Sequence, residues 1–234
     1  MKKIYVLIIS VTLSLVLFIS SFMLPQYCLD AITNKQPTYP VIIIDAGHGG
    51  FDGGASTDDG HNEKDINLRI ALLLNEYLTL SGFETVMTRD KDVSLEDTGL
   101  NTIRQKKTSD IHNRHKIMSD INNCIFVSIH QNHFSQSKYS GLQVFYSRNF
   151  SSESSLLAQS IQDSAVSLLQ PYNTRTIKEC GTSVYLIYNA VAPAVLVECG
   201  FLSNPEEASK LLDYTYCKEI AMAIALGIVK YTNS

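Results

Sequence analysis

The chain has 234 residues, 19 basic and 23 acidic side chains, and a formal net charge of −4 at pH 7. This length is enough for one well-buried domain, and the composition is ordinary for a globular protein. The slight negative charge and the lack of a long basic block argue against nucleic acid as a partner.

The N-terminus carries a hydrophobic segment. Residues 4–25 are almost wholly apolar and follow Lys2 and Lys3. This pattern predicts a signal sequence or a signal anchor over residues 1–25, and we favour the anchor because the apolar run approaches the length of a membrane span. In both cases the lysines stay on the cytoplasmic side and the rest of the chain is exported. The segment from Asp30 to Pro40 is polar, and we expect a linker over residues 26–40 before one domain over residues 41–234.

Short apolar runs rich in β-branched residues predict the strands of this domain. Val41-Ile-Ile-Ile-Asp45 is continuously apolar up to its last residue, which is typical of a strand buried on both faces. Further strands are expected at residues 83–88, 124–130, 142–146, 184–187 and 194–197.

Helical spacing of apolar residues separates most of these strands. Strands that alternate with helices predict a layered α/β fold with a largely parallel sheet. A polar loop is expected over residues 90–110. Helices are expected over residues 66–77, 111–118 and 157–168, after Pro205, and over residues 220–228.

Four polar residues stand where such a sheet places its active site. His48, His130 and Glu198 each fall at or just past the carboxyl end of a predicted buried strand. Glu63 precedes a helix, with Asn62 as a candidate N-cap, so it can reach the same edge. Two imidazoles and one carboxylate form the open catalytic zinc site of a hydrolase. We therefore expect His48, Glu63 and His130 to bind one Zn²⁺, with Glu198 as the candidate base.

Each of these residues also has an ordinary interpretation. His48 fits an exposed residue of a glycine-rich loop, and His130 fits a core histidine with satisfied hydrogen bonds. Glu63 fits a solvated first turn, where acidic side chains are favoured. Glu198 is the hardest to explain in this way, because a carboxylate after Ala194-Val-Leu-Val197 needs a partner or a function.

Neighbouring residues have candidate supporting roles. Asp45 or Asp52 is a candidate to accept a hydrogen bond from the far nitrogen of His48, which would fix its tautomer, but Asp52 fits a turn residue equally well. Asn132 is expected either to contact substrate near the metal or to cap its loop. The five cysteines are odd in number and scattered, which argues against a disulfide framework.

The motifs also carry a family resemblance. Asp45-Ala-Gly-His-Gly-Gly-Phe-Asp-Gly-Gly-Ala55, Glu63-Lys-Asp65, Ser128-Ile-His-Gln-Asn132 and Val197-Glu-Cys-Gly-Phe-Leu-Ser-Asn204 stand in the order typical of one enzyme family. The chain resembles the zinc-dependent N-acetylmuramoyl-L-alanine amidases of bacterial cell walls (the amidase 3 family) from Val41 to the C-terminus. Its layout is most similar to the germination-specific, spore-cortex members.

The resemblance implies a three-layer α/β fold with helices on both faces of a mixed, mostly parallel sheet of about six strands. It implies hydrolysis of the amide bond between N-acetylmuramic acid and L-alanine of peptidoglycan, by one zinc ion. In spore cortex, removal of the stem peptide prepares muramic-δ-lactam formation by a second enzyme. No wall-binding repeat is visible, so we expect an activating or targeting protein partner.

Two alternatives stay open at this point. A zinc carboxypeptidase or endopeptidase acting on stem peptides has the same ligand types, although no arginine stands close to a ligand motif to pair with a terminal carboxylate. The other alternative, a catalytically inactive wall-binding module, does not explain an intact Glu198.

Overall fold

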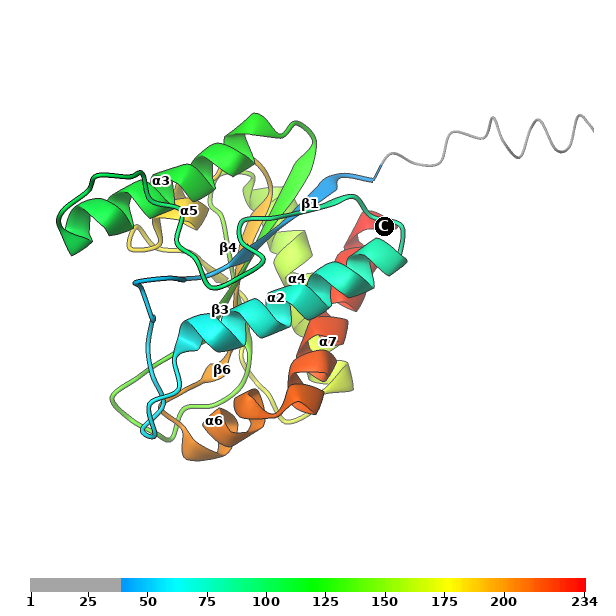
Figure 1. Ribbon diagram of the computed structural model, residues 1–234. Helices are drawn as coiled ribbons and strands as arrows, with labels where there is room; N and C mark the ends of the chain where they lie inside the picture. Colours follow the sequence, from blue (N-terminus) through cyan, green and yellow to red (C-terminus); the bar gives the residue numbers. More distant parts are fainter. Residues whose placement is uncertain (1–38) are drawn as a thin grey trace, which may run out of the picture. The chain divides into compact units, whose positions relative to one another are not determined.

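Six strands form one sheet in residues 39–234, the part of the chain that this computed structural model describes (Figure 1). Their order across the sheet is 2-1-3-6-4-5, and only the fourth and sixth strands pair antiparallel. This confirms the expected mixed, mostly parallel sheet. The strands are β1 (Val41–Ala46), β2 (Thr85–Met87), β3 (Cys124–Asn132), β4 (Gln143–Tyr146), β5 (Lys178–Glu179) and β6 (Ala194–Phe201).

The predicted anchor over residues 1–25 lies outside the described residues, as does the linker up to residue 38. No helix in the described range 39–234 is long and apolar enough to cross a membrane. Tyr39 already packs against the ring of Phe83, with 4.7 Å between centroids, and its hydroxyl donates to Asn233 at 2.9 Å.

Helices cover the two faces of the sheet unequally (Figure 1). On one face α2 (Glu63–Leu80), α4 (Ser151–Leu168) and α7 (Tyr214–Thr232) form a large core with Ile42 and Ile44 of β1. On the other face a smaller core contains Ile43, because side chains alternate along a strand. This second face is covered by α3 (Ile103–Asp120) and α5 (Tyr185–Tyr188).

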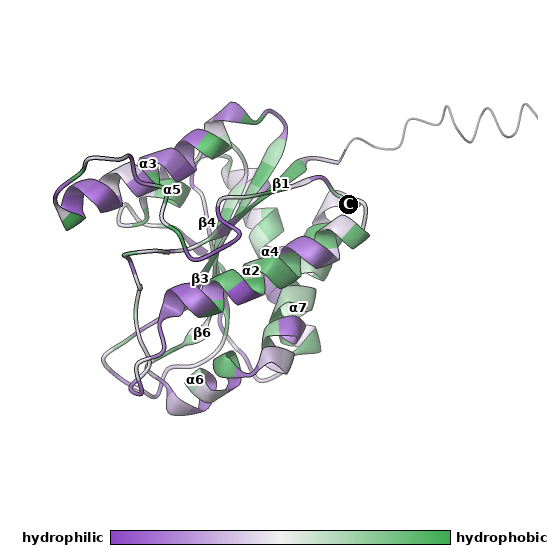
Figure 2. Ribbon diagram, viewed as in Figure 1, coloured by the Kyte–Doolittle hydropathy of each residue, from purple (hydrophilic) through white to green (hydrophobic). Residues whose placement is uncertain are grey.

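The cover on the second face is thin. Helix α3 buries only Arg114 and Met118 and is largely hydrophilic along its length (Figure 2). Helix α5 is a single turn of four residues. The short helix α6 (Pro205–Leu212) begins with Asn204 as its N-cap, beyond the carboxyl end of β6. The hydrophobic core on the face that carries α3 and α5 is therefore the smaller of the two.

Two predicted elements differ from the structure. The helix expected at residues 111–118 begins at Ile103, so the loop predicted over residues 90–110 is shorter. A capping box between Thr102 and Gln105 starts this helix. The sequence does not reveal the first turns, because the polar surface of the helix leaves no apolar periodicity. The strand expected at residues 184–187 is instead α5, because four apolar residues do not distinguish a strand from a helical turn.

Candidate metal centre and active site

His48, Glu63 and His130 come together at the carboxyl edge of the sheet. His48 lies in the loop after β1, Glu63 opens α2 and His130 lies near the end of β3. One nitrogen or carboxylate oxygen from each lies within 4.8 Å of the others. Glu63 Oε1 is 2.9 Å from His130 Nδ1, and Glu63 Oε2 is 3.2 Å from His48 Nε2. The glutamate thus lies between the two imidazoles, each about a quarter exposed (23%).

Glycines let the loop after β1 close around these side chains. A Cβ on Gly47 would lie 2.2 Å from His130 Nε2, and a Cβ on Gly54 would lie 2.6 Å from Glu63 Oε2. Gly54 also has a φ of +70°, and His48 itself has a φ of +61°. A non-glycine residue rarely adopts this conformation, and such residues concentrate at functional sites.

The partner of His48 is Asp52. His48 Nδ1 lies 3.0 Å from Asp52 Oδ2, which leaves Nε2 facing Glu63. Burial raises the pKa of Asp52, but hydrogen bonds from His48 and Lys107 outweigh it and hold the pKa well below its usual range. The carboxylate is therefore ionised and able to orient the imidazole.

Asp45 does not take the role expected for it beside His48. Its carboxylate accepts hydrogen bonds from Thr88 at 2.8 Å, Ser128 at 2.6 Å and Arg114 at 2.7 Å. As a strand residue it projects from β1 beneath α3, where Arg114 reaches it. Of the two carboxylates expected beside His48, Asp52 is therefore the partner and Asp45 is not, because a spacing of three residues from a histidine does not give the direction of a side chain.

Glu63 is held rigidly in its ionised form. The backbone N–H of Ala55 donates to Oε2 at 2.9 Å, and the backbone N–H of Gln131 donates to Oε1 at 3.0 Å. The Asn67 amide adds a third donor at 3.2 Å. Burial raises the pKa of Glu63, but hydrogen bonds from His130 and His48 outweigh it and depress the pKa strongly. Both oxygens are thereby oriented towards the imidazoles.

Glu198 lies beside His130 in a different setting. The two residues are paired across the parallel strands β6 and β3, and the register shifts directly afterwards, so that Phe201 pairs with Asn132. Glu198 Oε2 is buried and has no hydrogen-bond partner among residues 39–234. Burial is the main cause that raises its pKa, to about 7, with Glu63 adding repulsion and the histidines opposing it. A carboxyl group with a pKa near 7, and with a buried oxygen that has no hydrogen-bond partner in the described chain, suits proton transfer.

Arg89 and Arg114 contact the backbone of the loop that carries His48, although no sequence motif associates them with the site. Arg89 donates to the carbonyls of Ala46 and Gly47 at 2.8 and 2.9 Å, and Arg114 donates to the carbonyl of His48 at 2.6 Å. Both are buried and occupied by protein acceptors, so they shape the loop and present no free cation to a substrate. These contacts join residues more than 40 positions apart, and no local pattern announces them.

The other candidates fall outside the cluster or at its border. His61, which stands two positions before Glu63 in the sequence, pairs instead with Asp59 at 3.5 Å on the surface. Asn132 lies at the end of β3, two positions past His130, and its carbonyl accepts from the N–H of Leu202 at 2.9 Å. The described cysteines are buried and free, and Cys180 is close enough to Glu198 for that charge, together with burial, to raise the pKa of its thiol to about 11.

The cluster fits a metal ion by its chemistry. Two imidazole nitrogens and one carboxylate oxygen are the donors that zinc takes in catalytic sites with an open position. The carboxylate is ionised, and the orphaned oxygen of Glu198 lies next to the set. Burial of an unpaired carboxylate oxygen is costly, which is a mark of function rather than of stability.

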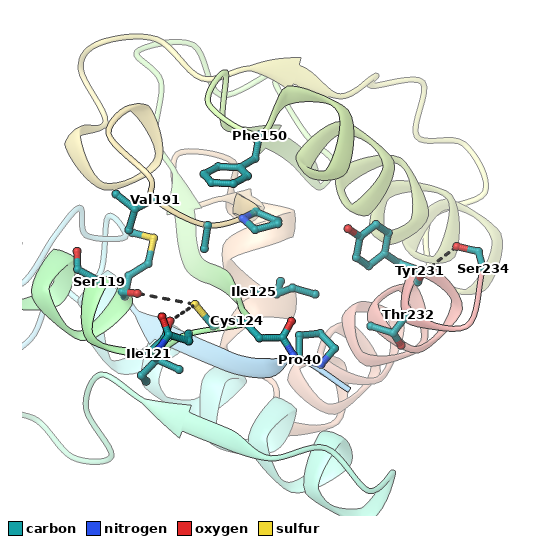
Figure 3. A pocket seen from close by; sticks show the side chains of 15 residues that line it. Pro40, Ser119, Ile121, Cys124, Ile125, Phe150, Val191, Tyr231, Thr232 and Ser234 are labelled. Carbon is teal, nitrogen blue, oxygen red and sulfur yellow. Dashed lines mark hydrogen bonds between the residues drawn. The ribbon is translucent and has the colours of Figure 1, made fainter. Parts of the chain in front are cut away.

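The opposite edge of the sheet carries a cavity of about 680 Å³ without such chemistry (Figure 3). Pro40, Cys124, Phe150 and Tyr231 lie around it, and Cys124 donates to the carbonyl of Ile121 at 3.2 Å. No carboxylate, imidazole or cationic side chain lines it. The chemistry of the described chain is therefore concentrated at the carboxyl edge.

An α/β sheet that gathers a His-Glu-His set and an unpaired carboxylate at its carboxyl edge is the arrangement expected of a hydrolase with a metal site. Comparison with known proteins narrows this class. The family model described as N-acetylmuramoyl-L-alanine amidase matches residues 42–230. The chain belongs to this family and hydrolyses the amide bond between N-acetylmuramic acid and L-alanine of peptidoglycan.

Individual relatives agree with this assignment. The germination-specific N-acetylmuramoyl-L-alanine amidase of Bacillus subtilis is 36% identical over 82% of this chain and 79% of its own length. The amidase LytC of the same organism is 33% identical over 81% of this chain, which corresponds to 35% of that longer protein. The CwlD amidase of Clostridioides difficile, solved in complex with the GerS lipoprotein, is 43% identical with a TM-score of 0.80, covering 83% of this chain and 98% of that one.

Proposed function

We propose that this chain is a zinc-dependent amidase of spore cortex peptidoglycan, which removes stem peptides before muramic-δ-lactam formation. The observation that carries the zinc dependence is the arrangement of His48, Glu63 and His130 around one point. The likeness to a germination-specific amidase supports the cortex as substrate. Peptidoglycan lies outside the cytoplasmic membrane, so the enzyme acts on the extracytoplasmic side.

The residues of the site divide the work of amide hydrolysis. Bound zinc acts as a Lewis acid towards water and the amide carbonyl. Glu63 and the two histidines would hold the ion, and Asp52 fixes the tautomer of His48. Glu198, whose oxygen has no other partner, takes the proton from the attacking water and delivers it to the leaving amine. Asn132 contacts the substrate beside His130.

Replacement of Glu198 by Gln separates the base from the ligands. The variant keeps shape and hydrogen bonding but cannot accept a proton. We expect zinc content close to that of the wild type and turnover reduced by at least roughly 10²-fold. His48→Ala, Glu63→Ala and His130→Ala are expected to lower zinc content instead. Loss of zinc from Glu198→Gln would make Glu198 a ligand, and full activity of a metal-free preparation would end the zinc mechanism.

The products distinguish the amidase from a carboxypeptidase or an endopeptidase. Mass spectrometry of peptidoglycan digests should find a free lactyl carboxylate on the glycan and a free L-alanine amine on intact stem peptides. A shortened stem peptide that stays attached to the glycan would support the alternative activities. Digestion of cortex and of vegetative wall side by side tests the preference for cortex.

Export and partnership complete the proposal. The apolar segment over residues 1–25 supports an uncleaved membrane anchor, which fractionation and N-terminal sequencing of the mature protein would test. The solved complex of the C. difficile relative with a lipoprotein supports an activating or targeting protein partner for this chain as well. Affinity purification from sporulating cells, with mass spectrometry of the co-purified proteins, tests this point.

A further inference from the structure

Arg175 carries a positive charge next to Gln143, the residue that is paired with Glu198 across β4 and β6. Its Nε donates to the carbonyl of Ser140 at 2.6 Å, its Nη1 donates to the amide oxygen of Gln143 at 3.0 Å, and its guanidinium lies over the ring of Phe201 at 4.5 Å. These contacts are all with neutral groups. Across residues 39–234 Arg175 forms no close ion pair and its Nη2 has no acceptor, although its charge is near enough to Glu207 to lower the pKa of that carboxyl.

Gln143 connects this guanidinium to Glu198. Gln143 and Glu198 are directly opposite each other in the antiparallel pair β4–β6. Side chains opposed in this way project from the same face, with Cβ atoms about 5 Å apart. Gln143 is buried, and its Nε2 donates to the carbonyl of Thr176 at 2.8 Å, so its orientation is fixed. Arg175 is therefore one fixed side chain away from the proposed base.

Arg175 lines a cavity of about 600 Å³, whose lining includes neither the metal ligands nor Glu198. Lys138 and Lys210 also line it, and so do Glu206 and Glu207. The carboxylate of Glu207 is buried and accepts the backbone N–H groups of Gly141 and Phe201 at 2.8 Å each. Glu207 is thus occupied within the protein, whereas Arg175 has donors left for a ligand.

The substrate carries its carboxylates on one side only. The acetylated sugars are uncharged, and the lactyl carboxyl of muramic acid is consumed in the scissile amide. Carboxylates remain on the stem peptide, beginning with the glutamate that follows L-alanine. A residue spans roughly 4 Å of chain, so this carboxylate lies several Å from the scissile bond, the scale of the two steps from Glu198 to Gln143 and from Gln143 to Arg175.

We propose that Arg175 binds the free α-carboxylate of the second stem-peptide residue and so determines which side of the substrate faces β4. The inference rests on the amidase function and adds a specificity-determining residue to it. A guanidinium offers paired N–H donors that match a carboxylate, and Gln143, Ser140 and Phe201 hold its plane before substrate arrives. Pre-orientation of this kind reduces the entropy lost on binding.

Two muropeptides that differ only in this group test the proposal: one with the second-residue α-carboxylate free, the other with a carboxamide. The zinc-loaded wild type should prefer the acid by at least about tenfold in kcat/KM, the scale of a hydrogen bond to a charged group. Arg175→Met should lower the rate on the acid to that on the amide and leave the amide rate unchanged. Arg175→Lys, which keeps the charge, should retain part of the preference.

Arg148→Met is the matched control, because the Arg148 guanidinium also stacks on an aromatic ring, that of Tyr188 at 5.4 Å. It should keep the full preference for the acid. The proposal is overturned if Arg175→Met keeps the preference, or if it lowers both rates equally while the protein stays folded by thermal unfolding. A wild type that cleaves both muropeptides equally overturns it alone, whereas a wild type that cleaves neither, also in the presence of its co-purified partner, overturns the amidase function as well.

Discussion

Gly54 and Gly60 share a left-handed backbone, with φ of +70° and +90°, but have different surroundings. A Cβ on Gly54 meets Glu63 Oε2 at 2.6 Å and His48 Cδ2 at 2.7 Å, whereas nothing lies within 4 Å of a Cβ on Gly60. The two positions therefore separate the cost of backbone strain from the cost of disturbing the metal ligands.

We expect Gly54→Ala to weaken zinc binding by at least about tenfold, since the loss of a supporting contact around metal ligands commonly costs 10–100-fold in affinity. Gly60→Ala should lose some stability through strain but bind zinc as the wild type does. Competition with a fluorescent zinc chelator measures both affinities. Equal zinc affinities for the two variants would contradict the steric account.

The buried carboxyl of Glu198 is expected to make the stability of the protein depend on pH. Its folded pKa of about 7 lies above its ordinary value of 4.5, so the folded state binds more protons between these values. The cost of ionising it in place is absent below pH 4.5, grows as the pH rises, and is complete above pH 7. In the presence of a chelator, Glu198→Gln should gain stability over the wild type on going from pH 4.5 to pH 8, by about 3 kcal/mol.

Urea unfolding of the metal-free proteins at the two pH values measures this gain. If the difference in free energy of unfolding between variant and wild type did not change with pH, the folded state would not raise the pKa of Glu198. The variant that is expected to lose turnover is thus also expected to be the more stable protein at pH 8.

At the scale of elements, the contact between α4 and α7 depends on one glycine. A Cβ on Gly227 would lie 2.5 Å from the Cα of Ile161, which is backbone and cannot rotate away. Alanine normally stabilises a helix relative to glycine. Here we expect Gly227→Ala to lower the free energy of unfolding by about 1–3 kcal/mol, the usual cost of overpacking. Met222→Ala, at an exposed position of α7, should change it little, and denaturant unfolding compares the two.

The elements also show what the sequence could predict. Strands β1, β3 and β6 are apolar and β-branched, so their carboxyl ends, and with them His48, His130 and Glu198, could be located. The sequence predicts too short a helix for α3, because α3 is polar. It predicts a strand in place of α5, because α5 is a single turn. Contacts that join distant segments, such as Arg114 with His48 or Arg175 with Gln143, have no local signal.

At the scale of the whole molecule, residues 39–234 form one compact unit, separate from Met1–Thr38. A protein that begins at Tyr39 should therefore be soluble and unfold in a single cooperative transition. Tyr39 is retained because it packs on Phe83 and donates to Asn233. Calorimetry and size-exclusion chromatography test this. An insoluble product from Tyr39, beside a well-behaved full chain, would assign part of the core to the preceding residues.

Pro40 and Ser234 line the same cavity, at the edge of the sheet opposite the metal ligands (Figure 3). Both ends of the described domain therefore emerge together, on the side away from the chemistry. Such a domain can be spliced onto other modules at either end, or inserted between them, without a neighbour having to cross the catalytic edge. This geometry is compatible with catalytic units of this kind in proteins of very different length, including a relative in which the region similar to this chain covers only 35% of the length.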